Sequence, residues 1–576
     1  MKRSGAYLVR FALEQIGVRF TFGIPGIHIT ELYDELGKSD SIRPILSTHE
    51  LGASFMADAV SRTGSSIGTV LVVPGAGITH AMSGIAEAFL DGIPLLVISS
   101  GARGDIGKEY QLHQIEQSTI LKSITKKTFR LNKHSKIITK IYKAYEIATS
   151  GTPGPVFLEI PAEVQHFSGG VKRLERFVPK GRRKKIDQNK ILKAANILVN
   201  AKRPGIYLGW GARESRQYSI RLAELLCAPV STTMQGISAF PADHPLHTGM
   251  GFGGAAVPAA EKAFQDCDCL LAVGARFSEF ATASYSLPVP KNLIHVDINP
   301  DVFNKNYKAK LTIEGDAREV LQSLTRYVEK LIKPRTSGEM CKLIEKEKLA
   351  YKNQWIKTVN KSQVSPGRFF KELDAILDDD AIVTVDSGNH TFLTAEHLPM
   401  SKSRFLISPT DFNAMGYAIP AAIGAKISNR DRRVVSIVGD GAFMMTGLEI
   451  VTAATNKLGL IYFVFKDGEL AQISQFQGIP FNRKTCTVLG AIKIEGVAKA
   501  TNSAYLQIKN DTEISRVIND AFRISDSGRP VVVEVNIDYS KRTRFTKGVI
   551  KANIKRIPRR DKVRILARAV SRRFTG

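Results

Sequence analysis

Short apolar runs alternate with segments of helical periodicity along most of this 576-residue chain. Val434 to Val438 and Leu460 to Phe465 are buried-strand patterns, and Leu448 to Asn456 between them has helical spacing. Parallel strands appear as continuous apolar runs because helices cover both of their faces. The alternation therefore predicts an α/β protein built from doubly wound parallel sheets.

The alternation comes in three blocks, so we expect three sheet domains and a C-terminal tail. Their predicted bounds are 1–168, 190–332, 360–540 and, for the tail, 541–576. The polar segment from Gly169 to Lys190, which includes Arg182-Arg183-Lys184-Lys185, predicts a linker after the first domain. The first and third blocks share one gross pattern, although no fixed-period sequence repeat relates them.

Composition is that of an ordinary globular protein, with 43% hydrophobic and 23% charged residues. No apolar run reaches the roughly 18–20 residues that span a bilayer. Five scattered cysteines fit a reducing compartment, and the N-terminus lacks a signal-peptide pattern. These features predict a cytoplasmic protein.

The net charge of +27 first suggests a nucleic-acid or membrane partner. Residues 541–576, however, hold 14 basic residues and one acid, so the tail alone carries +13. Arg560, Arg564, Arg568 and Arg572 recur every four residues on one helical stripe. Apolar residues lie at helical spacing on another face: Val563, Leu566, Val570 and Phe574. Such a helix either contacts an anionic membrane surface or packs on the protein with a solvated basic face.

Acidic residues follow two of the predicted strands. A predicted turn, Gly439-Asp440-Gly441, ends the run at Val438, and Asp467-Gly468 ends the run at Phe465. The carboxyl ends of parallel strands are where open α/β sheets bind ligands. Carboxylates bind Mg²⁺, and glycine lets the backbone approach a phosphate. The pattern predicts a metal-bridged diphosphate site.

The spacing of these motifs resembles the signature of thiamine-diphosphate enzymes, in which Gly-Asp-Gly is followed after 25 to 30 residues by Asn-Asn. Lys466-Asp467 stands at the second position here, and Asp is also an oxygen ligand for Mg²⁺. Gly23-Ile24-Pro25-Gly26 and His49-Glu50 are similar to segments of the acetolactate synthase and benzaldehyde lyase group. Gly388-Asn389-His390-Thr391 and Ala414-Met415-Gly416 resemble two further segments of the family.

The resemblance implies thiamine diphosphate and Mg²⁺ as cofactors, held between the first domain of one subunit and the third of another. The homodimer is then the smallest active unit, and a homotetramer is expected. Glu50 would hydrogen-bond the aminopyrimidine N1′, and Met415 would hold the cofactor bent. Asp440, Asp467 and the backbone carbonyl of Glu469 would bind Mg²⁺. The remaining cofactor contacts expected are Pro25, Gly388, Asn389, His390, Ala414, Gly439, Gly441, Ala442 and Ile473.

Substrate-side positions depart from the usual branched-chain synthase. His28 matches a histidine that lines the benzaldehyde lyase site, and His113 or Gln114 falls where related enzymes carry Gln or His. His80 stands where synthases usually have Asn. Gln472, Ile473 and Phe476 replace the Met-Val-x-x-Trp pattern of the anabolic pocket. We expect Glu50, His28, His113, Gln114 and Gln472 to be the catalytic groups.

The central domain raises the question of a flavin. Thr248 to Gly251 and Gly274 to Phe277 resemble flavin-contacting segments of acetolactate synthase. Gly253-Gly254-Ala255 and Ser278-Glu279, however, replace the usual His-Gly-Thr and Asp-Asp. Three outcomes stay open: bound FAD, a bound adenine nucleotide, or a vestigial site.

The expected function is decarboxylation of a 2-keto acid such as pyruvate, followed by joining to a second carbonyl compound, an aldehyde or ketone. The alternatives are a FAD-dependent pyruvate oxidase at the inner face of the membrane and a lyase similar to benzaldehyde lyase. A basic nucleic-acid-binding protein is the non-enzymatic alternative. It has no base-stacking aromatic motif in its favour and does not account for Glu50 or Met415.

Overall fold

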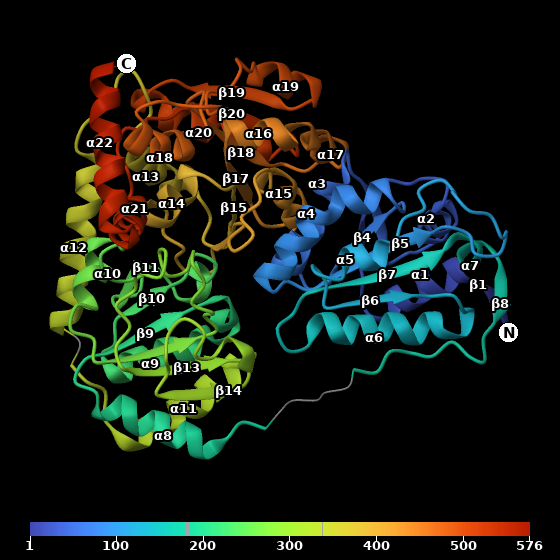
Figure 1. Cartoon of the computed structure of the whole chain (residues 1–576), viewed down its shortest axis with the longest axis horizontal. Helices are drawn as coiled ribbons and strands as arrows, with labels where there is room; N and C mark the ends of the chain where they lie inside the picture. The colour runs from blue at the N-terminus through green and yellow to red at the C-terminus, as the bar shows by residue number, and fades with distance from the viewer. Residues whose placement is uncertain (180–184, 337, 576) are drawn as a thin grey trace.

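Three six-stranded parallel sheets, each flanked by helices, make up the molecule (Figure 1). The computed structural model describes residues 1–179, 185–336 and 338–575, and only the backbone of residues 479, 480, 566, 574 and 575. Within those residues, the fold is three doubly wound α/β domains followed by two C-terminal helices, as predicted. Residues 180–184 of the expected linker lie outside the described part of the chain.

The N-terminal sheet has the strand order β3-β2-β4-β5-β7-β6. Its strands are β2 (Phe20–Gly23), β3 (Arg43–Leu46), β4 (Gly68–Val72), β5 (Leu95–Gly101), β6 (Lys127–Arg130) and β7 (Pro155–Pro161). Its helices are α1 (Gly5–Gln15), α2 (Thr30–Gly37), α3 (Glu50–Thr63), α4 (Ala76–Asp91), α5 (Gln117–Leu121), α6 (Ile137–Thr149) and α7 (Ala162–His166).

The C-terminal sheet repeats that order as β16-β15-β17-β18-β20-β19. Its strands are β15 (Ile382–Val385), β16 (Phe405–Ile407), β17 (Val434–Gly439), β18 (Ile461–Lys466), β19 (Ala504–Ile508) and β20 (Val531–Asn536). Its helices are α13 (Pro366–Ile376), α14 (Asn389–His397), α15 (Ala418–Ser428), α16 (Asp440–Thr446), α17 (Ile450–Thr455), α18 (Ala471–Phe481), α19 (Ile494–Ala500) and α20 (Ile514–Ser525). In both sheets the crossover direction reverses beside the first strand of the domain, which places a ligand crevice there.

The central sheet differs, because its order β11-β10-β9-β12-β13-β14 is that of a dinucleotide-binding fold. Its strands are β9 (Pro204–Leu208), β10 (Val230–Thr232), β11 (His247–Met250), β12 (Cys269–Val273), β13 (Asn292–Asp297) and β14 (Leu311–Glu314). Helices α8 (Gln188–Asn200), α9 (Arg216–Leu226), α10 (Pro258–Ala263) and α11 (Ala317–Leu331) flank it, and α12 (Gly338–Ile356) leads to the next domain.

Two local predictions are wrong. The linker was expected from Gly169 to Lys190, but β8 (Ser168–Gly170) pairs antiparallel with β1 (Lys2–Ser4), and α8 already begins at Gln188. Main-chain pairing of this kind needs no apolar side chains, so it leaves no hydrophobic pattern. Asp440 was expected in a turn, but it is the first residue of α16, where the helix dipole favours a carboxylate.

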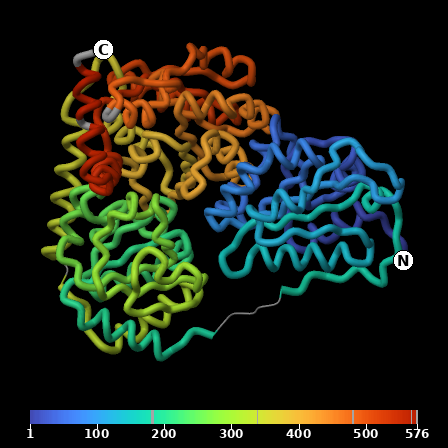
Figure 2. Tube along the Cα trace, in the orientation of Figure 1, coloured from blue at the N-terminus to red at the C-terminus, as the bar shows by residue number. Residues whose placement is uncertain are grey.

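The first and third domains pack through α3 and α15, and a buried polar network joins them. Arg62 contacts Asp58 at 2.6 Å and Asp91 at 2.9 Å, with no exposed side-chain surface on any of the three. The Tyr417 hydroxyl donates to Asp58 at 2.6 Å. Buried charges are costly unless they are paired, so this cluster of one cation and two carboxylates favours a single arrangement of the two domains. Figure 2 shows the N-terminal domain in contact with the C-terminal domain.

The tail forms α21 (Arg544–Arg556) and α22 (Arg559–Thr575) at the edge far from the N-terminal domain (Figure 1). The Arg568 guanidinium lies 4.7 Å from the ring centre of Phe481 in α18, and Arg572 donates to the Phe481 carbonyl. Part of the basic stripe therefore faces the protein, while Val563 and Val570 are exposed. Of the two alternatives, the tail packs on its own chain, but its basic stripe is not wholly solvated. Leu566 and Phe574 are among the side chains outside the described set.

Candidate active site

Asp440 and Asp467 leave neighbouring strands of the C-terminal sheet. Gly439 in β17 is in register with Phe465 in β18, so the residues that follow these two emerge together. Asp440 accepts hydrogen bonds from the amides of Gly468 at 2.8 Å and Gly441 at 2.9 Å. The Gly468 backbone is left-handed, with φ +74°, which suits glycine at this turn.

Both carboxyl groups are desolvated and close to each other. Asp440 is 2% exposed, and burial raises its pKa. Burial, helped by the Asp440 charge, raises the pKa of Asp467 to about 7. Neither has a Lys or Arg ion-pair partner in the described part of the chain. Two adjacent carboxylates without a counter-ion are the donor set that a divalent cation fits.

The Glu469 side chain is already engaged, because its carboxylate pairs with the Lys484 ammonium. That pairing also lowers the pKa of Glu469. The side chain is therefore not free for a metal, and only the backbone carbonyl is left for the role expected of this residue.

Glycines and an unpartnered imidazole line the adjacent turn. Gly388 precedes α14, and a Cβ on it would lie 2.6 Å from the His390 ring; a Cβ on Gly439 would lie 3.0 Å from the same ring. His390 is buried, which lowers its pKa to about 3, and its Nε2 has no hydrogen-bond partner among described residues. Asn389 is also buried, in the first turn of α14. A compact cradle with a free ring nitrogen fits a phosphate oxygen as its missing partner.

Met415 lies over this cradle. Its Cε would be 3.7 Å from a Cβ on Gly441, the residue before Ala442 in α16. The loop is held by Asp386, which accepts from the Gly416 amide at 2.9 Å and from the Ala418 amide at 2.8 Å. Burial raises the pKa of Asp386 to about 6. This positioning residue was not predicted from the sequence, although Asp386 directly follows strand β15, where parallel sheets carry functional side chains.

A second group missed by sequence reasoning ties the Met415 loop to the N-terminal domain. Glu87 in α4 accepts from the Ala414 amide at 3.0 Å and from the Thr410 amide at 3.2 Å. Asp91, one turn further, accepts from the Thr410 hydroxyl at 2.6 Å. Burial and the Asp91 charge raise the pKa of Glu87 well above its usual value.

Glu50 begins α3 in the N-terminal domain, next to the helix-capping His49. Its Oε2 lies 3.0 Å from Nδ1 of His80, and its side chain is 9% exposed. A Cβ on Gly77 would lie 3.2 Å from its Oε1. His49 and His80 stack at 4.7 Å between ring centres. One buried carboxylate thus lies beside a stacked pair of imidazoles at the N-terminal ends of α3 and α4.

The other N-terminal candidates divide into two sets. His28 and His113 meet edge to face at 5.4 Å, and burial, then the His113 charge, lowers the pKa of His28. The His113 carbonyl would lie 2.9 Å from a Cβ on Gly75, which places this histidine beside the start of α4. Gln114, by contrast, is exposed. Its side-chain Oε1 accepts a hydrogen bond from the backbone amide of Gln111, which closes a local turn. Pro25 is exposed on the loop after β2.

Within one chain the N-terminal and C-terminal groups lie apart along α4. The Glu50 carboxylate is beside Gly77, whereas Ala414 is bonded to Glu87. That part of the helix measures about 15 Å. Glu50 and the Met415 loop therefore contact α4 near opposite ends of the helix.

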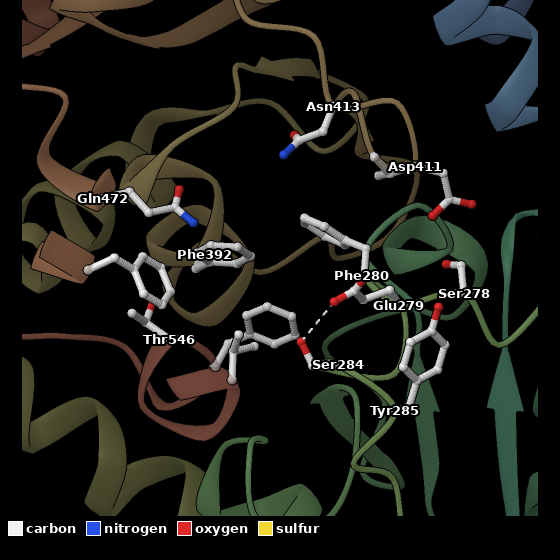
Figure 3. A pocket seen from close by; sticks show the side chains of 14 residues that line it. Ser278, Glu279, Phe280, Ser284, Tyr285, Phe392, Asp411, Asn413, Gln472 and Thr546 are labelled. Carbon is white, nitrogen blue, oxygen red and sulfur yellow. Dashed lines mark hydrogen bonds between the residues drawn. The ribbon is translucent and has the colours of Figure 1, made fainter. Parts of the chain in front are cut away.

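Helix α18 follows the turn that carries Asp467, and its side chains line part of a cavity of about 500 Å³ (Figure 3). Gln472 lines this cavity and points into it. Ile473 is 49% exposed on the same helix. The cavity walls come from the central domain, the C-terminal domain and α21.

The flavin-like segments of the central domain border two different spaces. Gly274, Ala275 and Arg276 line a cavity of about 30 Å³, which is the volume of about one water molecule. Thr248, Gly249 and Met250 line another, of about 210 Å³. Each space alone is smaller than the roughly 300 Å³ at which ligand pockets begin, but the space beside Arg276 shares Ser278, Phe280, Thr410 and Asp411 with the larger cavity beside α18.

Comparison with known proteins agrees with this architecture. Three thiamine pyrophosphate enzyme models match: the N-terminal binding domain at 3–120, the central domain at 191–324 and the C-terminal binding domain at 386–535. The chain is 31% identical to a probable acetolactate synthase large subunit of Methanocaldococcus jannaschii, covering 84% of this chain and 83% of that one. It is 29% identical to the acetolactate synthase isozyme 1 large subunit of Escherichia coli, covering 93% and 94%.

An acetolactate synthase of Mycobacterium bovis is 31% identical, over 92% of this chain and 87% of its own length. The matches span all three domains, and the two cofactor-binding models cover the segments that hold Glu50 and Asp440. The chain belongs to the thiamine pyrophosphate enzymes and is related throughout to acetolactate synthase large subunits.

Proposed function

We propose that this enzyme uses thiamine diphosphate and Mg²⁺ to decarboxylate a 2-keto acid, pyruvate in the first instance, and to join the remaining acyl group to a second carbonyl compound. The observation that carries the proposal is the pair of adjacent carboxylates, the buried Asp440 and the half-buried Asp467, beside the cradle of Gly388 and His390. The names of the related acetolactate synthases support the choice of reaction.

Asp440, Asp467 and the Glu469 carbonyl would hold Mg²⁺, and the ion would neutralise the diphosphate. Gly439, Gly441 and Ala442 would offer close backbone approach, and the His390 ring would line the cradle. When bound, thiamine diphosphate supplies a carbon nucleophile, and its positively charged thiazolium ring supplies the sink for the electrons released as CO₂ leaves. Met415 would set the cofactor's shape by packing against it.

Glu50 would hydrogen-bond N1′ of the aminopyrimidine and hold or release the proton there. The Glu50 side chain is only 9% exposed, so water competes little for that hydrogen bond. His80 contacts Glu50 directly, so it would orient that carboxyl group. His28 and His113 would face the substrate carbonyl.

The separation of about 15 Å along α4 supports an active site shared by two subunits. Glu50 of one chain would complete the site built around Asp440 of its partner, and the reverse. A homodimer is then the smallest active unit, with a tetramer as a further assembly.

A flavin-dependent pyruvate oxidase has less support. Gly253-Gly254-Ala255 and Ser278-Glu279 replace the residues usual in the flavin-contacting segments. A colourless purified protein, with no absorbance near 450 nm, would agree with this. A lyase that splits hydroxyketones remains the closer alternative, because the His28–His113 pair faces the same side as Glu50.

No helix in the described ranges is long and apolar enough to cross a membrane. Peripheral membrane contact through α22 stays a separate proposal, for which the exposed Val563 and Val570 are the available apolar side chains.

The decisive experiment incubates the purified enzyme with thiamine diphosphate, Mg²⁺ and pyruvate labelled at C1, and measures released CO₂ and products by mass spectrometry. We expect CO₂ release that depends on both cofactors and stops when a chelator removes Mg²⁺. A panel of other 2-keto acids tests the donor. Absence of CO₂ release from every keto acid would overturn the proposal, whereas cleavage of a hydroxyketone would favour the lyase.

A further inference from the structure

The cavity beside α18 has the size and the lining of a small-molecule site. It has about 500 Å³, within the usual range for small-molecule pockets. Gln472 and Phe476 of α18 line it, only a few residues beyond the Asp467 turn. It therefore opens next to the proposed metal and diphosphate site.

Three phenylalanine rings form one wall of the cavity. Phe392 stacks on Phe545 at 4.5 Å and on Phe280 at 5.6 Å between ring centres, and Phe280 lies 5.8 Å from Phe545. They come from the C-terminal domain, the tail helix α21 and the central domain respectively, so the wall exists only because all three meet (Figure 3). A continuous aromatic surface of this kind favours a flat, apolar group.

The charged groups that line the cavity are both acidic. Asp411 is paired with Arg276 at 2.8 Å, so this guanidinium is already neutralised. Glu279 accepts a hydrogen bond from Ser284 and has no cationic partner in the described part of the chain. No Lys, Arg or His is among the described lining residues. The Arg556 side chain lies behind this wall, engaged by the Ser284 carbonyl and the Tyr285 ring.

Two amide side chains supply the polar contacts. Gln472 and Asn413 both line the cavity and make no hydrogen bond to the described protein. Figure 3 shows the Gln472 amide directed toward the space in front of Phe392. An amide N–H₂ is a donor suited to a carbonyl oxygen, and it bears no charge to attract a carboxylate.

We propose that this cavity takes the second substrate, and that this substrate is an uncharged aldehyde with an aromatic or apolar side chain. A second 2-keto acid would bring a carboxylate next to Glu279 without a counter-charge. The inference rests on the proposed function, and it concerns only the acceptor.

The reaction then balances without an oxidant. The bond between C1 and C2 of the keto acid breaks, and C1 leaves as CO₂. A new bond forms between C2 and the aldehyde carbon, and the aldehyde oxygen takes up one proton. The product is a neutral 2-hydroxyketone.

The test offers the enzyme pyruvate with equal concentrations of benzaldehyde and 2-oxobutyrate and compares the two joined products. We expect the benzaldehyde product to exceed the keto-acid product by at least about tenfold in kcat/KM. Phe280→Arg, which adds a cation to the wall, should move that ratio toward the keto acid by about tenfold or more. Phe412→Arg makes the same change at an exposed phenylalanine outside the lining and should leave the ratio unchanged.

A binding measurement separates failure of this inference from failure of the proposed function. Benzamide and benzoate have the same shape and differ in charge, and saturation-transfer NMR detects either one without turnover. We expect benzamide to bind the holoenzyme and benzoate to bind only the Phe280→Arg variant. Equal binding of both, or preferred transfer to 2-oxobutyrate, would overturn the inference even if CO₂ release occurs. Absent CO₂ release with selective benzamide binding would instead overturn only the proposed function.

Discussion

The N-terminal and C-terminal sheets have the same strand order, yet the side chains that line their two crevices differ in burial and in the contacts they make. The C-terminal crevice is buried and internally connected: Asp440 is 2% exposed and accepts backbone amides from its own turn. The N-terminal crevice presents its groups outward. His80 keeps half of its side-chain surface exposed while it contacts Glu50.

This difference shows how one topology can serve two parts of one cofactor. A diphosphate and its metal need fixed, desolvated ligands, which a single chain can pre-arrange. Glu50 is buried as well, and it is the histidine in contact with it, His80, that leaves half of its side-chain surface for a second subunit to cover. The following variants test whether the two crevices have these separate roles.

Glu50→Gln should have the largest effect. Removing the proton-accepting carboxylate should lower kcat by about 10³-fold, within the range of general acid–base catalysis. Cofactor binding, followed by fluorescence quenching, should stay within a few-fold, because the metal ligands are untouched. Glu31→Gln is the matched control, since Glu31 also sits beside a histidine, His166, but on an exposed surface. Near-normal turnover of Glu50→Gln would refute the proton role.

Asp440→Ala should damage the other crevice. Losing a metal ligand should weaken Mg²⁺-dependent cofactor binding by about 100-fold, measured by the same titration. Asp526→Ala, at an exposed ion pair with Arg433, should leave that affinity unchanged.

Mixing the two damaged proteins then tests the shared site. If each site takes Glu50 from one chain and Asp440 from the other, reassorted dimers of Glu50→Gln and Asp440→Ala should regain about a quarter of normal activity. Each mixed dimer contains one intact site and one doubly damaged site. No recovery after demonstrated subunit exchange would place both groups in the same chain.

The site residues that could be predicted best from the sequence are those that directly follow a strand. Asp440 and Asp467 follow apolar runs, and parallel-sheet geometry alone brings them together. Asp386 also follows a strand, but nothing in its neighbours reveals which amides it will accept. Its partners, Gly416 and Ala418, come from a loop about 30 residues away whose path depends on tertiary packing.

The relation between domains was less accessible for a similar reason. Glu87 and Asp91 lie on an ordinary helical pattern, and their role appears only when the Thr410 loop reaches them. The tail shows the same limit. Its periodicity predicts a helix but cannot say that Arg568 would pack against Phe481.

Asp386→Asn should have a smaller effect than either active-site change. An Asn side chain has one oxygen acceptor instead of two, so its NH₂ group would face one of the two backbone N–H groups of the loop. The free energy of unfolding should therefore fall by about 1–3 kcal/mol. Activity should also fall, because the Met415 loop loses its anchor. Asp316→Asn is the control, since Asp316 also accepts two backbone amides, but at an exposed helix N-cap where Asn serves as well. Chemical denaturation of both variants checks this, and equal stability would contradict the anchoring role.

The pH dependence should give the smallest and most specific signal. The pKa of Asp467 is raised to about 7 without metal, against about 3.9 in an unfolded chain. Its contribution to the stability of the cofactor-free protein is therefore complete below about pH 4 and is lost as pH rises through 7. Mg²⁺ binding has the opposite sign, because the ligand must lose its proton, so affinity should rise by up to about tenfold per pH unit until pH 7. Thermal unfolding with and without Mg²⁺ at pH 6, 7 and 8 measures both trends. Asp467→Asn should abolish them together, whereas a metal affinity that does not change between pH 6 and 8 would remove Asp467 from the metal site and leave the buried crevice without its second carboxylate ligand.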